Sequence, residues 1–177
     1  RYGTLPFAGL ARAGFMAVQM LRSLVDVGVF SEADYDAFIA SVSTVSSQLT
    51  RDRAILDRAT FLERYGHLRP GTYDILSPRY DEKPEYYFDW SQHPSTPKLP
   101  HHFEPTSQQM QEIMKLMEVH SLQPDAVGLL EFMQSGIELR ELAKFHFTRN
   151  LSDVLVLIAE VGKDYGFNKE DLAYCDV

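Results

Sequence analysis

The sequence predicts a mainly α fold, a bundle-like domain of several helices interrupted by one long proline-rich irregular insertion. Apolar residues recur at spacings of three and four along most of the chain, which is the period of an amphipathic helix. No stretch alternates apolar and polar residues as a half-buried strand does. We therefore expect one helical domain over residues 1–177, with helices in 1–66, an irregular loop in 67–105 and helices in 106–177.

The first two helices are predicted from apolar periodicity and from the residues at their ends. The first runs from Pro6 to Val27 and has only a narrow polar stripe, so we expect it to be buried on most sides. Pro6 suits a first turn, and Gly28 suits a C-terminal stop. Ser31 then opens a second helix, because the acid three residues later in "SEAD" makes a form of capping box.

A third helix is predicted from about Arg51 to Tyr65, and Gly66 ends it. Regular structure then fades, because "PRYDEKPEYYFDWSQHPSTPKLPHHFEP" contains six prolines. A loop of this length is uncommon in a compact domain and is usually functional or partly disordered. The aromatic residues over 86–90 either pack into the domain or belong to a mobile excursion.

Helix resumes near Ser107, where methionines and an isoleucine over 110–117 make a stripe that is typical of a core face. Another helix starts at Pro124 and runs on, with a break expected near Asn150, until Gly166 ends it. The final stretch, "NKEDLAYCDV", adds a capped turn.

Composition and charge exclude several classes of function. The net charge of -8 argues against a general nucleic-acid binder, which concentrates positive charge. The longest apolar run, "VLVLIAEV", is far shorter than the roughly 20 residues that a membrane span needs. The single cysteine, Cys175, fits a reducing compartment, so we expect a cytoplasmic protein. Because the chain starts at Arg1 and stops after "AYCDV", we expect a piece of a longer protein.

Most recognisable catalytic and cofactor motifs are missing from the sequence. It contains no Walker-type phosphate loop, no G-x-G-x-x-G that opens a helix after a strand and no nucleophile elbow. The six histidines lack metal-ligand spacing, including the adjacent His101 and His102. We therefore predict no catalytic residue, no metal site and no cofactor within the chain itself.

The segment "YGHLRPGTYDILSPRY", residues 65–80, gathers the side chains most suited to binding. Arg69 and Arg79 can hold a carboxylate or phosphate in a planar fork. Asp74 can orient either arginine or accept the proton of a substrate hydroxyl, and His67 titrates near neutral pH. These four residues are the predicted substrate-binding residues. The structural alternative is that an Arg69–Asp74 or Arg79–Asp81 bridge pins the loop, with His67 capping the preceding helix.

Three stretches of the sequence carry a resemblance to a known family. "FLERYGHLRPGTYDILSPRYDE" and "GIELRELAKFHFTRNLSDVLVLIAEVGKDYGFNKEDLAYCDV" resemble the central region of phosphoenolpyruvate-utilising phosphotransferases, which include phosphoenolpyruvate synthase-like and rifampicin phosphotransferase-like proteins. The N-terminal "RYGTLPFAGLARAGFMAVQMLRSLV" is similar to the pyruvate, phosphate dikinase-like subgroup. The resemblance implies a helical domain between a nucleotide-binding and a phosphohistidine domain, both outside this chain. It also implies that His67, Arg69, Asp74 and Arg79 bind the acceptor or brace its pocket.

The resemblance leads to one functional expectation, and the residues alone leave another open. We expect a central linker or acceptor-contacting domain, inactive by itself, in a parent phosphotransferase that uses ATP or phosphoenolpyruvate with Mg. Its partners are then the other domains of the parent chain and a small-molecule acceptor, with no nucleic acid and no membrane. The alternative is a stand-alone helical binding or dimerisation module without catalysis, in which apolar faces pack between the chains of a homodimer. An independent enzyme has the least support.

Overall fold

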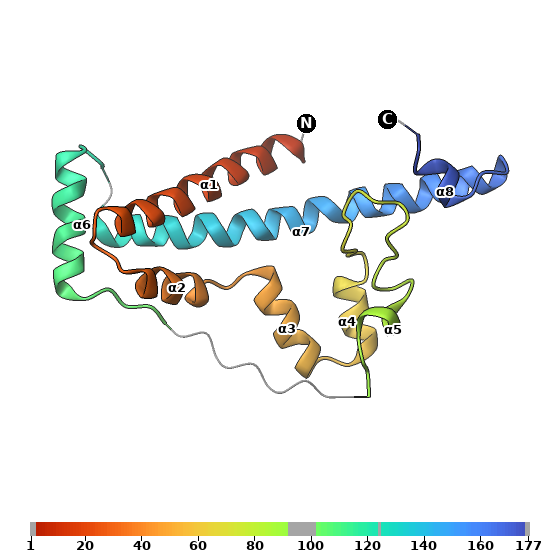
Figure 1. The fold of residues 1–177 in the computed structure, drawn as a ribbon, viewed down its shortest axis with the longest axis horizontal. Helices are drawn as coiled ribbons and strands as arrows, with labels where there is room; N and C mark the ends of the chain where they lie inside the picture. Colours follow the sequence, from red (N-terminus) through yellow and green to blue (C-terminus); the bar gives the residue numbers. More distant parts are fainter. Residues whose placement is uncertain (1–2, 92–101, 124, 176–177) are drawn as a thin grey trace. The chain divides into compact units, whose positions relative to one another are not determined.

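The computed structural model describes residues 3–91, 102–123 and 125–175, and it confirms the mainly α class (Figure 1). Its described part contains eight helices and no strand. In chain order the helices are α1 (Thr4–Asp26), α2 (Glu32–Ser41), α3 (Val45–Ile55), α4 (Arg58–Tyr65), α5 (Pro84–Tyr87), α6 (Ser107–Val119), α7 (Ala126–Asp164) and α8 (Lys169–Leu172).

The described residues fall into two compact units, each assembled from two separate stretches of the chain. The first unit contains residues 3–47, 102–123 and 125–144, and the second contains 48–91 and 145–175. Helix α7 therefore contributes its N-terminal half to one unit and its C-terminal half to the other. The sequence led us to expect one domain over 1–177, which stays a prediction.

Several helix ends predicted from sequence are confirmed. Gly28 follows α1 with a φ of 79°, a conformation that favours glycine, and its amide donates to the carbonyl of Val25. Ser31 and Asp34 form a full capping box at the start of α2. The amide of Gly66, at the end of α4, donates to the carbonyl of Leu62.

The predicted helix over 51–65 is wrong, because two helices occupy this region. Helix α3 starts earlier, at Val45, and ends at Ile55. Asp57 then starts α4: its carboxylate accepts from the amide of Thr60 at 3.0 Å and from the Thr60 hydroxyl at 2.7 Å. This N-cap satisfies amides that a continuous helix would have paired with its own carbonyls, so the chain restarts instead of continuing.

The predicted break near Asn150 is also wrong, because α7 runs through this position over 39 residues. Asn150 is exposed, so its side chain does not have to be accommodated in a packed interior. The modest intrinsic cost of an asparagine in a helix is outweighed where neighbouring turns are buried, as at Phe145 and Ser152.

The first unit has an apolar core in which α1 packs closely on α7. A Cβ added to Gly14 would lie 2.9 Å from the carbonyl oxygen of Gly136, and a Cβ added to Gly136 would lie 3.0 Å from the Cβ of Ala17. The helix backbones therefore approach more closely than larger side chains would allow. The core cluster comprises Ala17, Leu21, Leu24, Phe30, Phe38, Val42, Ile113, Met117, Ala126, Leu129, Met133 and Ile137.

Burial of α1 is less complete than its sequence predicted. Its buried residues line one face, whereas Leu5, Phe15 and Met16 remain exposed in the described part of the chain. The expectation of a helix buried on most sides is therefore wrong, because apolar composition does not show how many faces find a partner. On α6, Ile113 and Met117 are buried as expected of a core face, whereas Met114 of the same predicted stripe is exposed.

The second unit is organised around an aromatic cluster. The rings of Phe88 and Trp90 meet the ring of Phe61 edge to face, with centroids 5.2 and 5.8 Å apart. The short helix α5, inside the region predicted to be irregular, precedes these two residues. Of the predicted aromatic group, Tyr86 remains exposed. The rest of the proline-rich stretch, residues 92–101, lies outside the described residues.

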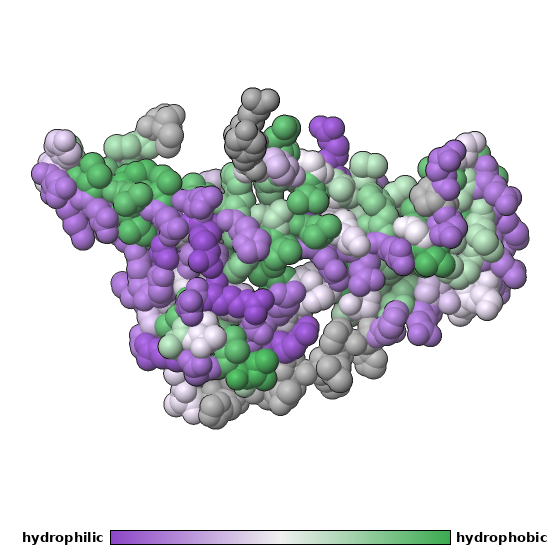
Figure 2. All heavy atoms as spheres, turned by 180° about the vertical axis from the view of Figure 1, so that it is seen from behind, coloured by the Kyte–Doolittle hydropathy of each residue, from purple (hydrophilic) through white to green (hydrophobic). Residues whose placement is uncertain are grey.

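Apolar side chains also gather on the surface at the C-terminal end of α7 (Figure 2). A shallow groove of about 360 Å³ is lined there by residues that include Val154, Leu157, Ile158 and Val161. In the described part of the chain, no helix is both long and apolar enough to cross a membrane.

Candidate functional site

The loop over 66–81 leaves the end of α4 and returns to its own starting point. The amide of Tyr80 donates to the carbonyl of Leu68 at 2.9 Å, and the amide of Asp81 donates to the carbonyl of Gly66 at 3.1 Å. A Cβ added to Gly66 would lie 2.9 Å from the Cβ of Asp81, so the first and last residues of the loop lie close together at its base. The predicted site residues are therefore carried by a closed loop.

Arg69 is buried inside this loop with only 7% of its surface exposed. Its guanidinium donates to the carbonyls of Asp74 and Ser77, at 3.3 and 3.1 Å. On α7 it reaches the hydroxyl of Ser152 at 3.3 Å and the carbonyl of the same residue at 3.4 Å. Burial lowers the pKa of Arg69. This fork binds three of the chain's own carbonyls and the Ser152 hydroxyl.

Arg79 forms the second connection between the loop and α7. Its guanidinium donates to both carboxylate oxygens of Asp81, at 2.9 and 2.6 Å, and to Asp153 at 2.7 Å. Burial acts to lower the pKa of Arg79, but these two carboxylates outweigh it and raise the pKa. The predicted Arg79–Asp81 bridge is confirmed, whereas Arg69 binds the carbonyl of Asp74 and not its carboxylate.

His67 is the most deeply buried of the four residues, with 3% of its surface exposed. Its carbonyl accepts from the Ser152 hydroxyl at 2.7 Å, and its ring meets that of Phe145 edge to face. Neither ring nitrogen has a hydrogen-bond partner among the described residues, so the expectation that His67 caps α4 is wrong. Burial, and then the positive charge of Arg149, lower its pKa to about 4.

Asp74 alone among the four is exposed, beside the exposed Tyr73 at the tip of the loop. One carboxylate oxygen of Asp74 accepts from the amide of Leu76 at 2.9 Å, an arrangement that shapes the turn. The four predicted residues are thus brought onto one loop but face different surroundings. Their role in substrate binding stays a prediction.

Ser152 and Asp153 complete this arrangement, and sequence reasoning missed both. They follow the loop residues they contact by between 74 and 85 positions. The only available signal was a small polar residue, Ser152, within the helical run "RNLSDVLVL". A buried serine on an otherwise apolar face suggests a hydrogen-bond partner elsewhere, but it does not identify that partner.

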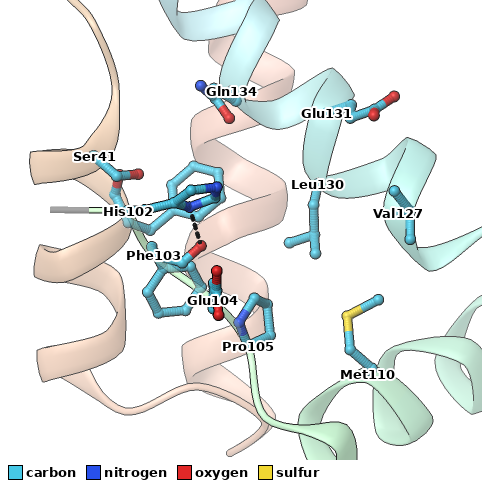
Figure 3. A pocket seen from close by; sticks show the side chains of 11 residues that line it. Ser41, His102, Phe103, Glu104, Pro105, Met110, Val127, Leu130, Glu131 and Gln134 are labelled. Carbon is cyan, nitrogen blue, oxygen red and sulfur yellow. Dashed lines mark hydrogen bonds between the residues drawn. The ribbon is translucent and has the colours of Figure 1, made fainter. Parts of the chain in front are cut away.

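A second candidate site lies in the first unit (Figure 3). It is a hollow of about 710 Å³ between α2, the segment over 102–105, α6 and α7. Figure 3 shows Leu130 on α7 facing across the hollow towards Phe103 and Met110. The ring of Phe103 is held edge to face against Phe30 and Phe38, at centroid distances of 5.4 and 5.6 Å.

Polar groups at this hollow are acidic or neutral. Glu104 and Glu131 are the charged residues of its described lining, which contains neither lysine nor arginine. In Figure 3, Glu104 lies beside Phe103 and Pro105, whereas Glu131 on α7 points away from them. An apolar floor with a carboxylate suits a ligand with an apolar body and a cationic group.

Comparisons with known proteins found no family model, no curated protein and no solved structure that matches the chain. Among the described residues, no group of three or more His, Cys, Asp or Glu side chains is placed to hold a metal ion.

Proposed function

We propose that the chain is the central helical domain of a phosphoenolpyruvate synthase-like phosphotransferase, with a loop that borders the acceptor. The support is the resemblance of "YGHLRPGTYDILSPRY" and of the α7 sequence to that family. In this proposal the nucleotide-binding and phosphohistidine domains of the parent protein supply the chemistry with ATP and Mg, in the cytoplasm. The fragment itself is inactive.

The observation that carries this proposal is the internal use of the loop's polar groups. Arg69 and Arg79 are occupied by carbonyls and carboxylates of the second unit, and His67 is buried. Such groups suit a brace that holds a surface in one conformation. Acceptor contact then falls to the exposed tip, at Asp74 and Tyr73, where a carboxylate can accept a hydrogen bond from an acceptor hydroxyl.

Asp74 offers a matched pair of substitutions to test this role in the intact parent enzyme. Asp74→Asn keeps an oxygen for the amide of Leu76 but removes the charge, whereas Asp74→Ala removes both. We expect both variants to raise KM for the acceptor by about tenfold, the usual order for one charge-assisted hydrogen bond. Autophosphorylation with ATP should not change. Unchanged acceptor KM in both variants would remove the loop tip from the site.

The size of the native polypeptide tests the multidomain part of the proposal. An antibody raised against this 20.2 kDa chain should detect a band several times larger in the source cells. A band near 20 kDa would contradict a multidomain parent and would favour the alternative below.

The alternative is a stand-alone helical binding module, and the hollow beside Glu104 is the observation that favours it. We expect this module to bind a small amphipathic cation, because its apolar floor carries a carboxylate and its described lining contains neither lysine nor arginine. Calorimetric titration with 4-phenylbutylamine, 4-phenylbutanol and 4-phenylbutanoate should rank the amine first and the acid last. Glu104→Gln should remove the preference for the amine, and Glu112→Gln, outside the lining, should keep it.

Dimerisation is the other form of this alternative, and it would use the apolar groove on the C-terminal part of α7. Sedimentation at several concentrations tests it directly. A Leu157→Lys substitution, on an exposed residue, should then shift the chain to a monomer. A monomer at every concentration in the unsubstituted chain would contradict dimerisation.

A further inference from the structure

A small, partly open cavity lies beside the buried residue His67. Its volume is about 10 Å³, and it is lined by His67, Leu68, Arg69, Thr72, Thr148 and Ser152. All of these residues belong to the loop over 66–81 or to α7 in the second unit. Five of the six carry side-chain polar atoms, so the cavity is small but polar.

The ring of His67 is the feature that calls for an explanation. A neutral imidazole has one N–H donor and one nitrogen acceptor. Both nitrogens are inaccessible and lack hydrogen-bond partners among the described residues. Burial and Arg149 lower the pKa of His67, and the nearby carbonyl of Phe145 acts against them, but it does not meet hydrogen-bond geometry with either nitrogen. Native proteins leave few buried polar groups unpaired.

The other polar groups around the cavity have bonding capacity left over. The guanidinium of Arg69 has five N–H groups, of which four are used by Asp74, Ser77 and Ser152. The hydroxyl of Thr148 donates to the carbonyl of Phe145 at 3.2 Å, which leaves its oxygen as an acceptor. These groups offer both donors and acceptors to whatever fills the cavity.

Thr72 adds one more hydroxyl, and it makes no hydrogen bond to another described side chain or backbone group. An internal water needs two to four polar partners and a cavity of at least about 10–15 Å³. A phosphate or an organic acceptor is several times too large for this space. Both the size of the cavity and its polar lining therefore favour a single water molecule as the occupant.

We propose that a single structural water occupies this cavity and links the ring of His67 on the loop to the hydroxyl of Thr148 on α7. The water accepts from or donates to the imidazole, depending on the tautomer, and uses its remaining bonds on Thr148, Thr72 and Arg69. The loop is then fixed to α7 by three adjacent devices: the Arg69 fork, the Arg79 ion pairs and this bridge. The proposal does not depend on the function proposed above.

A double-mutant cycle on the complete chain tests the bridge. His67→Phe keeps a ring and removes the nitrogens, and Thr148→Val keeps the shape and removes the hydroxyl. Each substitution removes one end of the bridge. We therefore expect the factor by which the double variant changes the unfolding equilibrium constant to be at least fivefold smaller than the product of the factors for the two single variants. Thr148→Ser, which keeps a hydroxyl, should stay within twofold of the unsubstituted chain. Additivity within twofold would overturn the proposal.

A direct observation on the unsubstituted chain keeps the test decisive if a variant fails to fold. A crystal structure at about 1.5 Å or better should contain one water between His67 and Thr148 at hydrogen-bond distances of about 2.7–3.2 Å. In solution, a ring proton of His67 should give a nuclear Overhauser effect to long-lived water. A dry cavity, with the imidazole bonded directly to the carbonyl of Phe145, would overturn the proposal.

Discussion

The two units of this chain bury different kinds of side chain. The core cluster of the first unit is entirely apolar, and the close approach of α1 to α7 occurs at two glycines, Gly14 and Gly136. The second unit contains the three buried polar residues of the described chain: His67, Arg69 and Ser152. The first unit is therefore held by shape and volume, whereas the loop of the second unit is held by directed hydrogen bonds. The stability of the first unit should therefore respond to changes of side-chain size, and that of the loop in the second unit to changes of polarity, pH and salt.

Removing the buried guanidinium should have the largest effect and would test the polar half of this comparison. Arg69→Met keeps length but removes the guanidinium donor from the carbonyls of Asp74, Ser77 and Ser152, of which that of Asp74 keeps another donor, the amide of Ser77. We expect a loss of about 3 kcal/mol or more in the free energy of unfolding, because each unsatisfied buried group costs about 1–3 kcal/mol. Urea unfolding followed by the fluorescence of Trp90, in the second unit, measures it. Arg12→Met, on an exposed residue, is the control and should stay within about 0.5 kcal/mol.

A pH titration should produce the next largest effect, again in the second unit. The pKa of His67 is lowered from 6.5 to about 4, first by burial and then by Arg149. Between these values the unfolded chain binds a proton that the folded chain excludes. Stability should therefore fall as the pH falls from 6.5 to 4, by at most about 3 kcal/mol, and this contribution should then level off.

His67→Phe should remove that slope, and His120→Gln, on an exposed residue, should keep it. Urea midpoints at half-unit steps between pH 4 and 7 measure the difference. An equal slope in the unsubstituted chain and in His67→Phe would show that carboxylates, not this histidine, cause the acid sensitivity.

Overpacking the contact between α1 and α7 should have a smaller effect and tests the apolar half of the comparison. A Cβ on Gly14 would lie 2.8 Å from that of Arg140 and 2.9 Å from the carbonyl of Gly136. We expect Gly14→Val to destabilise the chain by about 1–3 kcal/mol. Gly9→Ala, in the same helix with open space around it, should be stabilising by about 0.5–1 kcal/mol. If both substitutions change the free energy of unfolding by the same amount, the close approach of the α1 and α7 backbones does not determine how these helices pack.

The smallest effect is expected from the exposed partner of Arg79. Asp153→Asn removes one of the two carboxylates that pair with Arg79. We expect a loss of about 0.5–1 kcal/mol in the free energy of unfolding, and this loss should shrink with added salt. Glu32→Gln breaks the more exposed pair with Arg22 and should cost less. Thermal unfolding at low and high salt compares them. A loss that does not depend on salt would mean that Asp153 acts through packing.

Local signals made the α class and several helix ends predictable from the sequence. Gly28, Ser31 and Gly66 act on neighbours within a few residues, so their roles can be read from the printed sequence. The division between α3 and α4 also had a local signal, since Asp57 precedes Thr60 by three positions. That signal competes with helical periodicity on both sides, and the prediction followed the periodicity.

The arrangement of the candidate site was not predictable in the same way. Four loop residues were selected for their chemistry, but the partners that decide their roles, Ser152 and Asp153, lie on a helix far along the sequence. Residue types alone cannot distinguish an arginine that binds a ligand from one that donates hydrogen bonds to backbone carbonyls of the same chain. The exposed apolar side of α1, at Phe15 and Met16, shows the same limit, because burial depends on which faces find partners.

The distance in sequence between the loop and its anchors has a consequence for synthesis on the ribosome. Ser152 follows Arg69 by 83 residues, so at about 5–20 residues per second the anchor is translated roughly 4–17 seconds after the loop. During this interval water must solvate the guanidinium and the carbonyls that it later binds. A nascent chain that stops before residue 152 has the whole loop but lacks its anchor, so it should be digested within 66–81 by a protease that leaves the released protein intact.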